Sequence, residues 1–303
     1  NSLKAKLCKE GNKLLYRYCN DKGISHNPIG KMIIGDENSE EYLAYLIDNG
    51  KENNVKGLEF LTEKTIKQYE PNVSAKFAIL SNTTGIIDSH QFALSLENDI
   101  QEAGGLISKR IKIGNIENSD NWEITIKDRQ PFLIKSEMLI NASGLNSYEL
   151  AKSLGINDIP PARFFIGHYF KYNCQNPFQR LIYPVPDDHG LGIHSTSDLD
   201  GNLRFGPDAE EISQISYDFI NEFNRKKIFA SSIRKYFPGL RSDKLQPDYS
   251  GIRIRLGKTH YESDFYIKKS DASGTSNLIN LIGIESPGLT ASLAIGRYVS
   301  KLI

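Results

Sequence analysis

Two segments far apart in the chain share one pattern, and this pattern restricts the fold more than any other feature. Met138–Asn141 is a short apolar strand that runs into the small residues Ala142–Gly144 and then into a helix over residues 145–154. Leu278–Ile284 is a second apolar strand, followed by a turn and a helix over residues 287–302. A strand, a tight turn and a returning helix form the repeating unit of an α/β sheet.

The remaining segments show two kinds of pattern. Helices are predicted for a stripe from Leu3 to Tyr18 and for residues 39–49, 62–70 and 89–103, and strands for residues 31–34, 77–80, 106–113 and 122–127. After Pro160–Pro161 strands dominate, at residues 167–172, 181–185, 192–196, 203–206, 251–256 and 265–268, with one helical stretch between residues 212 and 237. We therefore expect an α/β (α+β) protein with two interleaved domains, one of which is mainly antiparallel sheet.

Charge and cysteine content exclude several classes of protein. The chain has 37 Lys and Arg against 37 Asp and Glu, so it lacks the positive surplus of a nucleic-acid or polybasic membrane binder. Its three cysteines form no CxxC pair, which fits a reducing cytoplasm. The longest apolar run contains Asn280 and is too short to cross a membrane. We expect a cytoplasmic protein, with membrane association left undecided.

The two strand–turn–helix units are candidate ligand sites. At Asn141, Ala142, Ser143 and Gly144 the small side chains let a ligand approach the backbone, and a helix start favours negative charge. In the second unit Pro287 and Gly288 begin the helix, with Ser286 or Thr290 available as its cap. Such a helix start stabilises an anion by about 0.3–1 kcal/mol. The alternatives are an ordinary tight turn and a capped terminal helix.

A third candidate is the segment Gly251–Gly257, which alternates Arg253 and Arg255 with Ile252 and Ile254. Arginine binds a carboxylate through two hydrogen bonds, so this pair could clamp an acid. The common alternative is a solvated strand face.

His194 follows glycines at positions 190 and 192 and is a candidate proton acceptor at neutral pH. His26, His90, His168, His189 and His260 are equal candidates by spacing alone. No metal is expected, because no two histidines have ligand spacing. The chain also contains no GxSxG, no Walker loop and no GxGxxG dinucleotide-binding turn.

Taken together, these segments resemble one family. The chain is similar to the FAD-dependent oxidoreductases of the D-amino-acid-oxidase class and, within it, to the L-2-hydroxyglutarate dehydrogenase-like members. The segments that carry the resemblance are Ser2–Cys8, Leu14–Cys19, Gly30–Ile34, Thr84–His90, Leu139–Leu145, Leu181–Pro186, Gly190–His194, Phe205–Asp208, Tyr249–Arg253 and Gly283–Ile295. They follow the family's order over essentially the whole chain.

The resemblance implies a discontinuous, Rossmann-like FAD-binding domain interleaved with an antiparallel substrate domain. The flavin domain would comprise residues 76–160 and 272–303, and residues 1–75 and 161–271 would form the helical segment and the substrate domain. Asn141–Gly144 would lie beside the phosphate and ribose of FAD. Gly283, Ser286, Pro287, Gly288, Leu289 and Thr290 would bring a helix start to the flavin ring.

The resemblance also implies the chemistry, which is oxidation of a 2-hydroxy acid by hydride transfer to flavin. Gly251, Ile252 and Arg253 would border the ring and the substrate carboxylate, and His194 would be the leading candidate base. Two positions depart from the family pattern, because Ile166 replaces an expected basic residue and Ile254 replaces a frequent proline. The identity of the substrate therefore stays open.

Because relatives begin with a GxGxxG unit, we expect this chain to be truncated at its N-terminus, by a cut or by a split gene. Two alternatives to oxidation of a 2-hydroxy acid stay open. The first is an oxidase of amino acids or other amines from the same class. The second is a non-catalytic fragment that needs a second polypeptide to supply the missing segment, with an open sheet edge in its absence.

Overall fold

The computed structural model describes residues 2–127, 130–185, 192–219, 221–258, 263–270, 272 and 274–303. The chain forms two compact units. Unit 1 comprises residues 1–18, 93–164 and 253–303, and unit 2 comprises residues 19–92 and 165–252. Each unit is assembled from separate stretches of sequence, as interleaving predicts.

Unit 1 is built on a three-stranded sheet in the order β16 (Tyr266–Ser270), β17 (Leu278–Ile282), β9 (Leu139–Asn141). The central strand β17 is antiparallel to β16 and parallel to β9. β9 leads into a 3-10 turn and α5 (Ser147–Ser153), and β17 leads into α7 (Gly288–Val299). Both predicted strand–turn–helix units are therefore confirmed.

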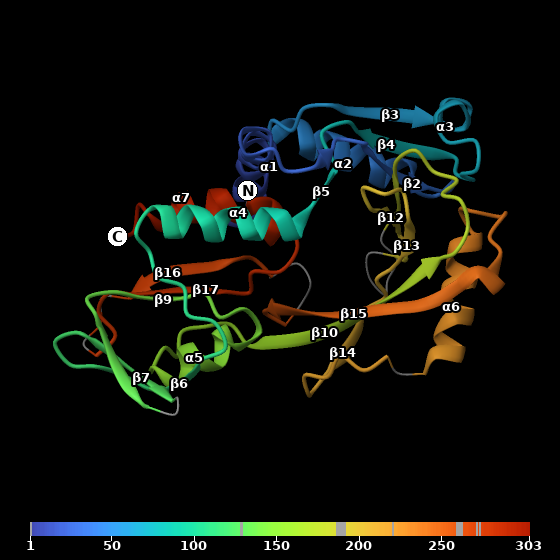
Figure 1. The fold of residues 1–303 in the computed structure, drawn as a ribbon. Helices are drawn as coiled ribbons and strands as arrows, with labels where there is room; N and C mark the ends of the chain where they lie inside the picture. The colour runs from blue at the N-terminus through green and yellow to red at the C-terminus, as the bar shows by residue number, and fades with distance from the viewer. Residues whose placement is uncertain are drawn as a thin grey trace. The chain divides into compact units, whose positions relative to one another are not determined.

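Helices cover one face of this sheet (Figure 1). The first turns of α1 (Leu3–Lys22) and the whole of α7 pack there, with Leu7, Ile279 and Ala291 in a shared apolar cluster. Gly11 allows α1 to approach α7 closely, because a Cβ at this position would lie 2.6 Å from Ala291 Cα and still closer to Thr290 O. The apolar stripe of α1 is therefore the face that packs in this cluster.

The opposite face of the sheet carries α5 and a second sheet. This second sheet is antiparallel, in the order β6 (Lys112–Asn118), β7 (Trp122–Lys127), β8 (Phe132–Ser136). Trp122 is 1% exposed and clusters with Leu278 of β17. Ala151 of α5 clusters with Ile282. The central strand 278–282 is therefore covered on both faces, as a buried parallel strand requires, whereas Ile140 of the neighbouring β9 is 42% exposed.

Unit 2 contains two larger sheets. One has the order β11 (Leu181–Pro184), β2 (Lys31–Gly35), β4 (Phe77–Ser81), β3 (Leu58–Thr62). The other has the order β12 (Ser195–Ser197), β13 (Leu203–Phe205), β10 (Ala162–Tyr172), β14 (Glu210–Ile212), with β15 (Leu245–Leu256) also pairing β10. The pair β11–β2 is parallel, and the pairs β2–β4, β3–β4, β10–β13 and β12–β13 are antiparallel.

Alternating side chains of β2 and β4 separate two apolar layers. Ile79 packs against Leu43 of α2 (Glu40–Glu52). Met32 and Leu80 point the other way, into a core that contains Phe170 of β10 and Phe229 of α6 (Glu222–Arg234). The other elements are the helix α4 (Ser89–Glu102) and the short elements β1 (His26–Asn27), β5 (Ile86–Ile87), α3 (Glu63–Tyr69) and η2 (Ser242–Lys244).

Two predicted strands begin several residues later than expected. β6 begins at Lys112 rather than at residue 106, because Arg110 has a φ of +60° and Leu106 is 97% exposed. β12 covers only residues 195–197, because Gly192 has a φ of +69°. A positive φ is incompatible with extended strand geometry, so each of these residues interrupts its predicted strand.

The unit boundaries also differ from the expected domain boundaries. Residues 76–92 cluster with unit 2, because β4 pairs with β2 and β3. Residues 1–18 cluster with unit 1, where α1 packs on α7. The assignment of flavin to residues 76–160 and 272–303 stays a prediction. In the described part of the chain, no helix has both the length and the apolar character to cross a bilayer.

Candidate functional site

In unit 1 the parallel pairing of β9 and β17 brings two predicted segments to one sheet edge. Asn141 and Asn280 are register partners, so both strands end on the same side. The turn Ala142–Gly144 and the segment Gly283–Pro287 leave the sheet from this edge. Ligands of α/β sheets bind outside the carboxyl ends of the strands, so this edge is the first candidate site.

Asn141 holds the turn after β9 in shape. Its side chain is buried, and its Nδ2 donates to Ser147 O at 2.8 Å and to Asn280 Oδ1 at 2.9 Å. Its Oδ1 accepts the Ser143 hydroxyl at 2.7 Å. Gly144 has a φ of +61° and nothing within 4 Å of the position of a Cβ. Asn141 therefore fixes the backbone, while Ala142, Ser143 and Gly144 are exposed.

Backbone geometry rather than a side-chain cap defines the start of α7. Pro287 occupies the N-cap position without a side-chain hydrogen bond, so the cap expected from Ser286 or Thr290 is absent there. Gly283 has a φ of +69°, and a Cβ on it would lie 2.8 Å from Leu256 Cγ. Ser286 and Leu289 are exposed. The first turn of a helix carries backbone N–H groups without intrahelical partners, and here it opens towards solvent.

This edge suits FAD by the chemistry of its donors. A helix start places partial positive charge and N–H donors where an anionic oxygen can be bound. The exposed turn Ala142–Gly144, with open space beside Gly144, lets a phosphate or ribose approach the backbone. Both features come from unit 1 alone.

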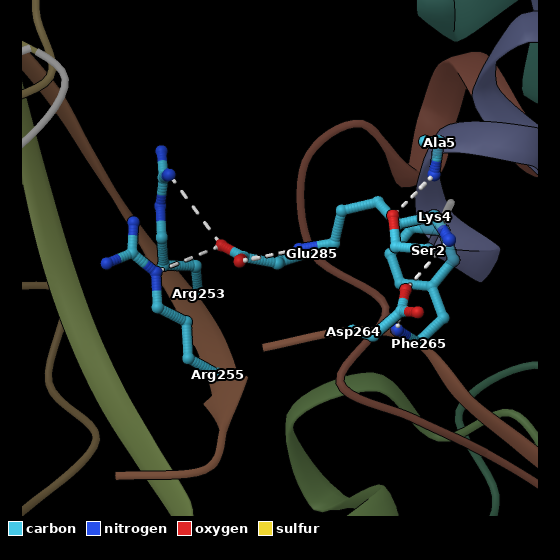
Figure 2. A network of polar contacts seen from close by, with 8 residues as sticks. All are labelled: Ser2, Lys4, Ala5, Arg253, Arg255, Asp264, Phe265 and Glu285. Carbon is cyan, nitrogen blue, oxygen red and sulfur yellow. Dashed lines mark hydrogen bonds and ion pairs between the residues drawn. The ribbon is translucent and has the colours of Figure 1, made fainter. Parts of the chain in front are cut away.

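Arg253 and Arg255 lie at the end of β15, in unit 1, and alternate with the buried Ile254. Their side chains are 24% and 15% exposed, so both are partly buried. Both converge on Glu285, with Arg255 Nε 3.5 Å and Arg253 Nη1 3.7 Å from Glu285 Oε2 (Figure 2).

Glu285 was not singled out from the sequence. Its side chain is 4% exposed, and its Oε1 accepts a hydrogen bond from Lys4 Nζ at 3.2 Å. Asp264 holds Lys4 nearby, because its carboxylate accepts the backbone N–H groups of Leu3 and Lys4 at 2.7 and 2.8 Å. The available signal was that Glu285 is the only ionisable residue in the segment Ile284–Ala294.

Gly251 and Ile252 lie on the part of β15 that belongs to unit 2. No atom lies within 4 Å of a Cβ on Gly251. Two residues earlier, Tyr249 stacks on Tyr169 of β10, with ring centroids 4.5 Å apart. Partial burial raises the pKa of the Tyr249 hydroxyl, which keeps it protonated at neutral pH. Gly251 thus lies on the same face of β15 as Tyr249.

His194 lies directly before β12 in unit 2 and is 7% exposed. Its ring stacks on the ring of Tyr183, with centroids 3.9 Å apart and an interplanar angle of 18°. Its carbonyl oxygen accepts the N–H of Gly206 at 2.9 Å. The imidazole is therefore held by stacking and by its backbone. Gly190 and Leu191 of the predicted segment, with His189 and His260, lie outside the described residues.

His168 belongs to a buried polar network that sequence reasoning missed. It is fully buried on β10, and its Nδ1 lies 3.0 Å from Asp208 Oδ1. Asp208 also pairs with Arg225 of α6. The ring of His168 meets Phe219 edge-on at 4.9 Å. This network holds α6 to the sheet. Among the residues with described positions, no group of three His, Cys, Asp or Glu side chains could hold a metal ion.

Comparison with known proteins identifies a family. Residues 1–302 match the family described as "FAD dependent oxidoreductase" (DAO). The chain is 34% identical to the mitochondrial L-2-hydroxyglutarate dehydrogenase of Arabidopsis thaliana, over 99% of this chain and 71% of that protein. It is 27% identical to the L-2-hydroxyglutarate dehydrogenase of Indibacter alkaliphilus, over 99% of this chain and 84% of that protein.

Solved structures share the fold. The L-α-glycerophosphate oxidase of Mycoplasma pneumoniae, solved with FAD bound, has a TM-score of 0.86 at 22% identity, over 100% of this chain and 80% of that one. The L-proline dehydrogenase of P. horikoshii has a TM-score of 0.82 at 17% identity, over 100% of this chain and 79% of that one. The comparisons give no support to the alternative in which a second polypeptide completes the chain.

Proposed function

Because the chain belongs to the DAO family of FAD-dependent oxidoreductases, we propose that it oxidises a 2-hydroxy acid, with L-2-hydroxyglutarate as the first candidate. The curated relatives reported above are dehydrogenases of that acid. The observation that carries the proposal is that Arg253 is partly buried and lies beside the buried carboxylate of Glu285.

In this proposal, unit 1 holds the cofactor at the carboxyl edge of its sheet. Ala142, Ser143 and Gly144 contact the phosphate and ribose of FAD, and Asn141 keeps their backbone in shape. Gly283 and the residues Ser286–Thr290 present the start of α7 to the flavin ring. When bound, FAD accepts the hydride that leaves C2 of the acid.

Arg253 binds the substrate carboxylate in this proposal. Its Nη1 lies 3.7 Å from Glu285 Oε2, which is within ion-pair range but longer than a hydrogen bond. The guanidinium therefore keeps N–H donors for a second carboxylate. Arginine offers five donors in a planar fork, so it can hold the acid in two hydrogen bonds and orient C2. Gly251 and Ile252 border the ring beside it.

His194 accepts the proton of the substrate hydroxyl in this proposal. An imidazole has an ordinary pKa near neutrality, so its neutral form can take this proton under physiological conditions. Stacking on Tyr183 limits rotation of the ring. Loss of the hydroxyl proton to His194 and of the C2 hydride would convert the 2-hydroxy acid into a 2-oxo acid.

An absorbance spectrum tests the proposal against its alternatives. The purified chain is incubated with FAD, desalted and titrated anaerobically with L-2-hydroxyglutarate, with its D-enantiomer and with L-glutamate. We expect a retained flavin spectrum that only L-2-hydroxyglutarate bleaches.

Bleaching by L-glutamate alone would support the amine-oxidase alternative instead. No retained flavin would support the non-catalytic fragment, since the same spectrum reports the cofactor before any substrate is added.

A further inference from the structure

We propose that Glu285 is a positioning residue that sets the orientation of Arg253 towards the substrate carboxylate and links this arginine to the start of α7. The inference rests on the proposed function, because it assumes that Arg253 binds the acid. It concerns residues of unit 1 only.

Glu285 joins three parts of unit 1 through its side chain. Its Oε1 contacts Lys4 Nζ of α1 at 3.2 Å, and its Oε2 faces Arg255 Nε at 3.5 Å and Arg253 Nη1 at 3.7 Å on β15 (Figure 2). Its backbone fixes it to the loop before α7, where its N–H donates to Gly283 O at 2.9 Å and its carbonyl accepts the N–H of Gly288.

The unequal distances indicate how the carboxylate acts on each arginine. A carboxylate that is 4% exposed needs cationic partners, because burial without them is costly. Of the three cations around Glu285, Arg253 lies farthest from the carboxylate. Its side chain is also more exposed than that of Arg255, at 24% against 15%. Glu285 thus attracts Arg253 by charge while leaving its hydrogen-bond donors to a ligand.

Without the charge of Glu285, the two arginines would repel each other. They point to the same side of β15, two positions apart, and their shared counter-charge is Glu285. Loss of that charge removes the force that holds the Arg253 guanidinium in place. A ligand carboxylate would then have to order a mobile arginine, so binding weakens while the reacting groups on the substrate stay unchanged.

The test is the substitution Glu285→Gln, which keeps the size of the side chain and removes its charge. We expect KM for L-2-hydroxyglutarate to rise at least about tenfold, with kcat changed less than about threefold, because Glu285 does not contact the reacting atoms. A matched control is Glu70→Gln, which removes the other buried carboxylate that pairs with an arginine, Arg180, within unit 2. This control should leave KM unchanged.

A double-mutant cycle with Arg253→Ala separates positioning from general stability. If Glu285 acts through Arg253, then Glu285→Gln in the Arg253→Ala background should change KM less than about twofold. Additive effects in the cycle would overturn the proposal. If Glu285→Gln does not fold, Glu285→Asp replaces it, and we expect a smaller rise in KM because the charge is retained.

Binding of 2-oxoglutarate by calorimetry gives a readout that does not depend on turnover. Its Kd should rise in Glu285→Gln at least about tenfold, while the FAD content of the protein stays that of the wild type. Equal Kd values in wild type and variant would refute the role of Glu285 alone. Failure of the wild type to oxidise any 2-hydroxy acid would refute the proposed function, and failure to bind the 2-oxo acid as well would refute both.

Discussion

At the scale of single residues, two buried carboxylates pair with arginines in different surroundings. Glu70 is fully buried in unit 2, where Gln179 N–H donates to its Oε1 and Oε2 at 3.1 Å and Arg180 lies 3.4 Å away. Burial nevertheless raises the pKa of Glu70 above its ordinary value of 4.5. The cost of removing this carboxylate from water exceeds the gain from its partners.

The raised pKa of Glu70 predicts a dependence of stability on pH. Above pH 4.5 the folded chain holds a proton on Glu70 more tightly than the unfolded chain does. The stability from this group is therefore complete below pH 4.5 and is lost as the pH rises through the folded-state pKa. Urea unfolding from pH 4 upwards should show that wild type loses stability relative to Glu70→Gln across this window. A constant difference between the two proteins would contradict the prediction.

His194→Gln tests the proposed base. We expect kcat to fall by roughly 10²–10⁴, because glutamine cannot accept the hydroxyl proton, while KM changes little. The pH dependence of kcat on the acidic side should also disappear. His90→Gln is the control, because His90 is exposed on α4. A His194→Gln variant with the wild-type kcat would leave this histidine a packing role against Tyr183.

At the scale of elements, the contact between α1 and α7 depends on one glycine. We expect Gly11→Ala to destabilise the fold by about 1–3 kcal/mol, because the new Cβ would overlap the backbone of Thr290 and Ala291. Gly296→Ala on α7 is the matched control, because nothing lies within 4 Å of a Cβ there. It should stabilise by up to about 1 kcal/mol. Urea unfolding measures both.

If the two alanine variants are equally stable, α1 and α7 do not pack as described. Flavin retention should fall in Gly11→Ala alone, because the displaced backbone at Thr290 belongs to the proposed cofactor segment.

Sequence patterns predicted elements best where local signals act alone. The apolar stripe Leu3–Tyr18 lies within α1, and the predicted helix 89–103 corresponds to α4, before which Asp88 accepts the N–H groups of His90 and Gln91 at 3.0 and 2.9 Å. The strand 122–127 has the predicted bounds. β8 was missed because its side chains are mostly exposed and show no alternation. The positive φ of Arg110 has no sequence signal, because arginine rarely adopts this conformation.

The candidate site shows the same division between local and distant information. Each segment by itself shows that the strands 139–141 and 278–282 are followed by a turn of small residues and a helix. Their parallel pairing joins Asn141 and Asn280, which are 139 positions apart, and no local pattern encodes that contact. The role of Glu285 likewise depends on Lys4, 281 positions away. The sequence therefore indicates the candidates, and the structure shows which of unit 1's residues meet.

At the scale of the whole molecule, FAD should stabilise the chain as a ligand of the folded state. A ligand at 100 times its Kd adds about 2.7 kcal/mol, which raises Tm by several degrees in thermal unfolding. Riboflavin should give a smaller shift, because it lacks the phosphate and ribose portion proposed to meet Ala142–Gly144. Equal shifts from the two compounds would remove this turn from the cofactor site.

The position of β17 in the sequence has a consequence for biosynthesis. The strand is the centre of the unit 1 sheet, yet it is translated after β9 and after every segment of unit 2. Asn280 follows Asn141 by 139 positions. At about 5–20 residues per second, the ribosome therefore adds Asn280 about 7–28 s after Asn141. During that interval unit 2 can fold while β9 waits without its partner strand. The nascent chain thus carries β9 without its strand partner until synthesis reaches β17.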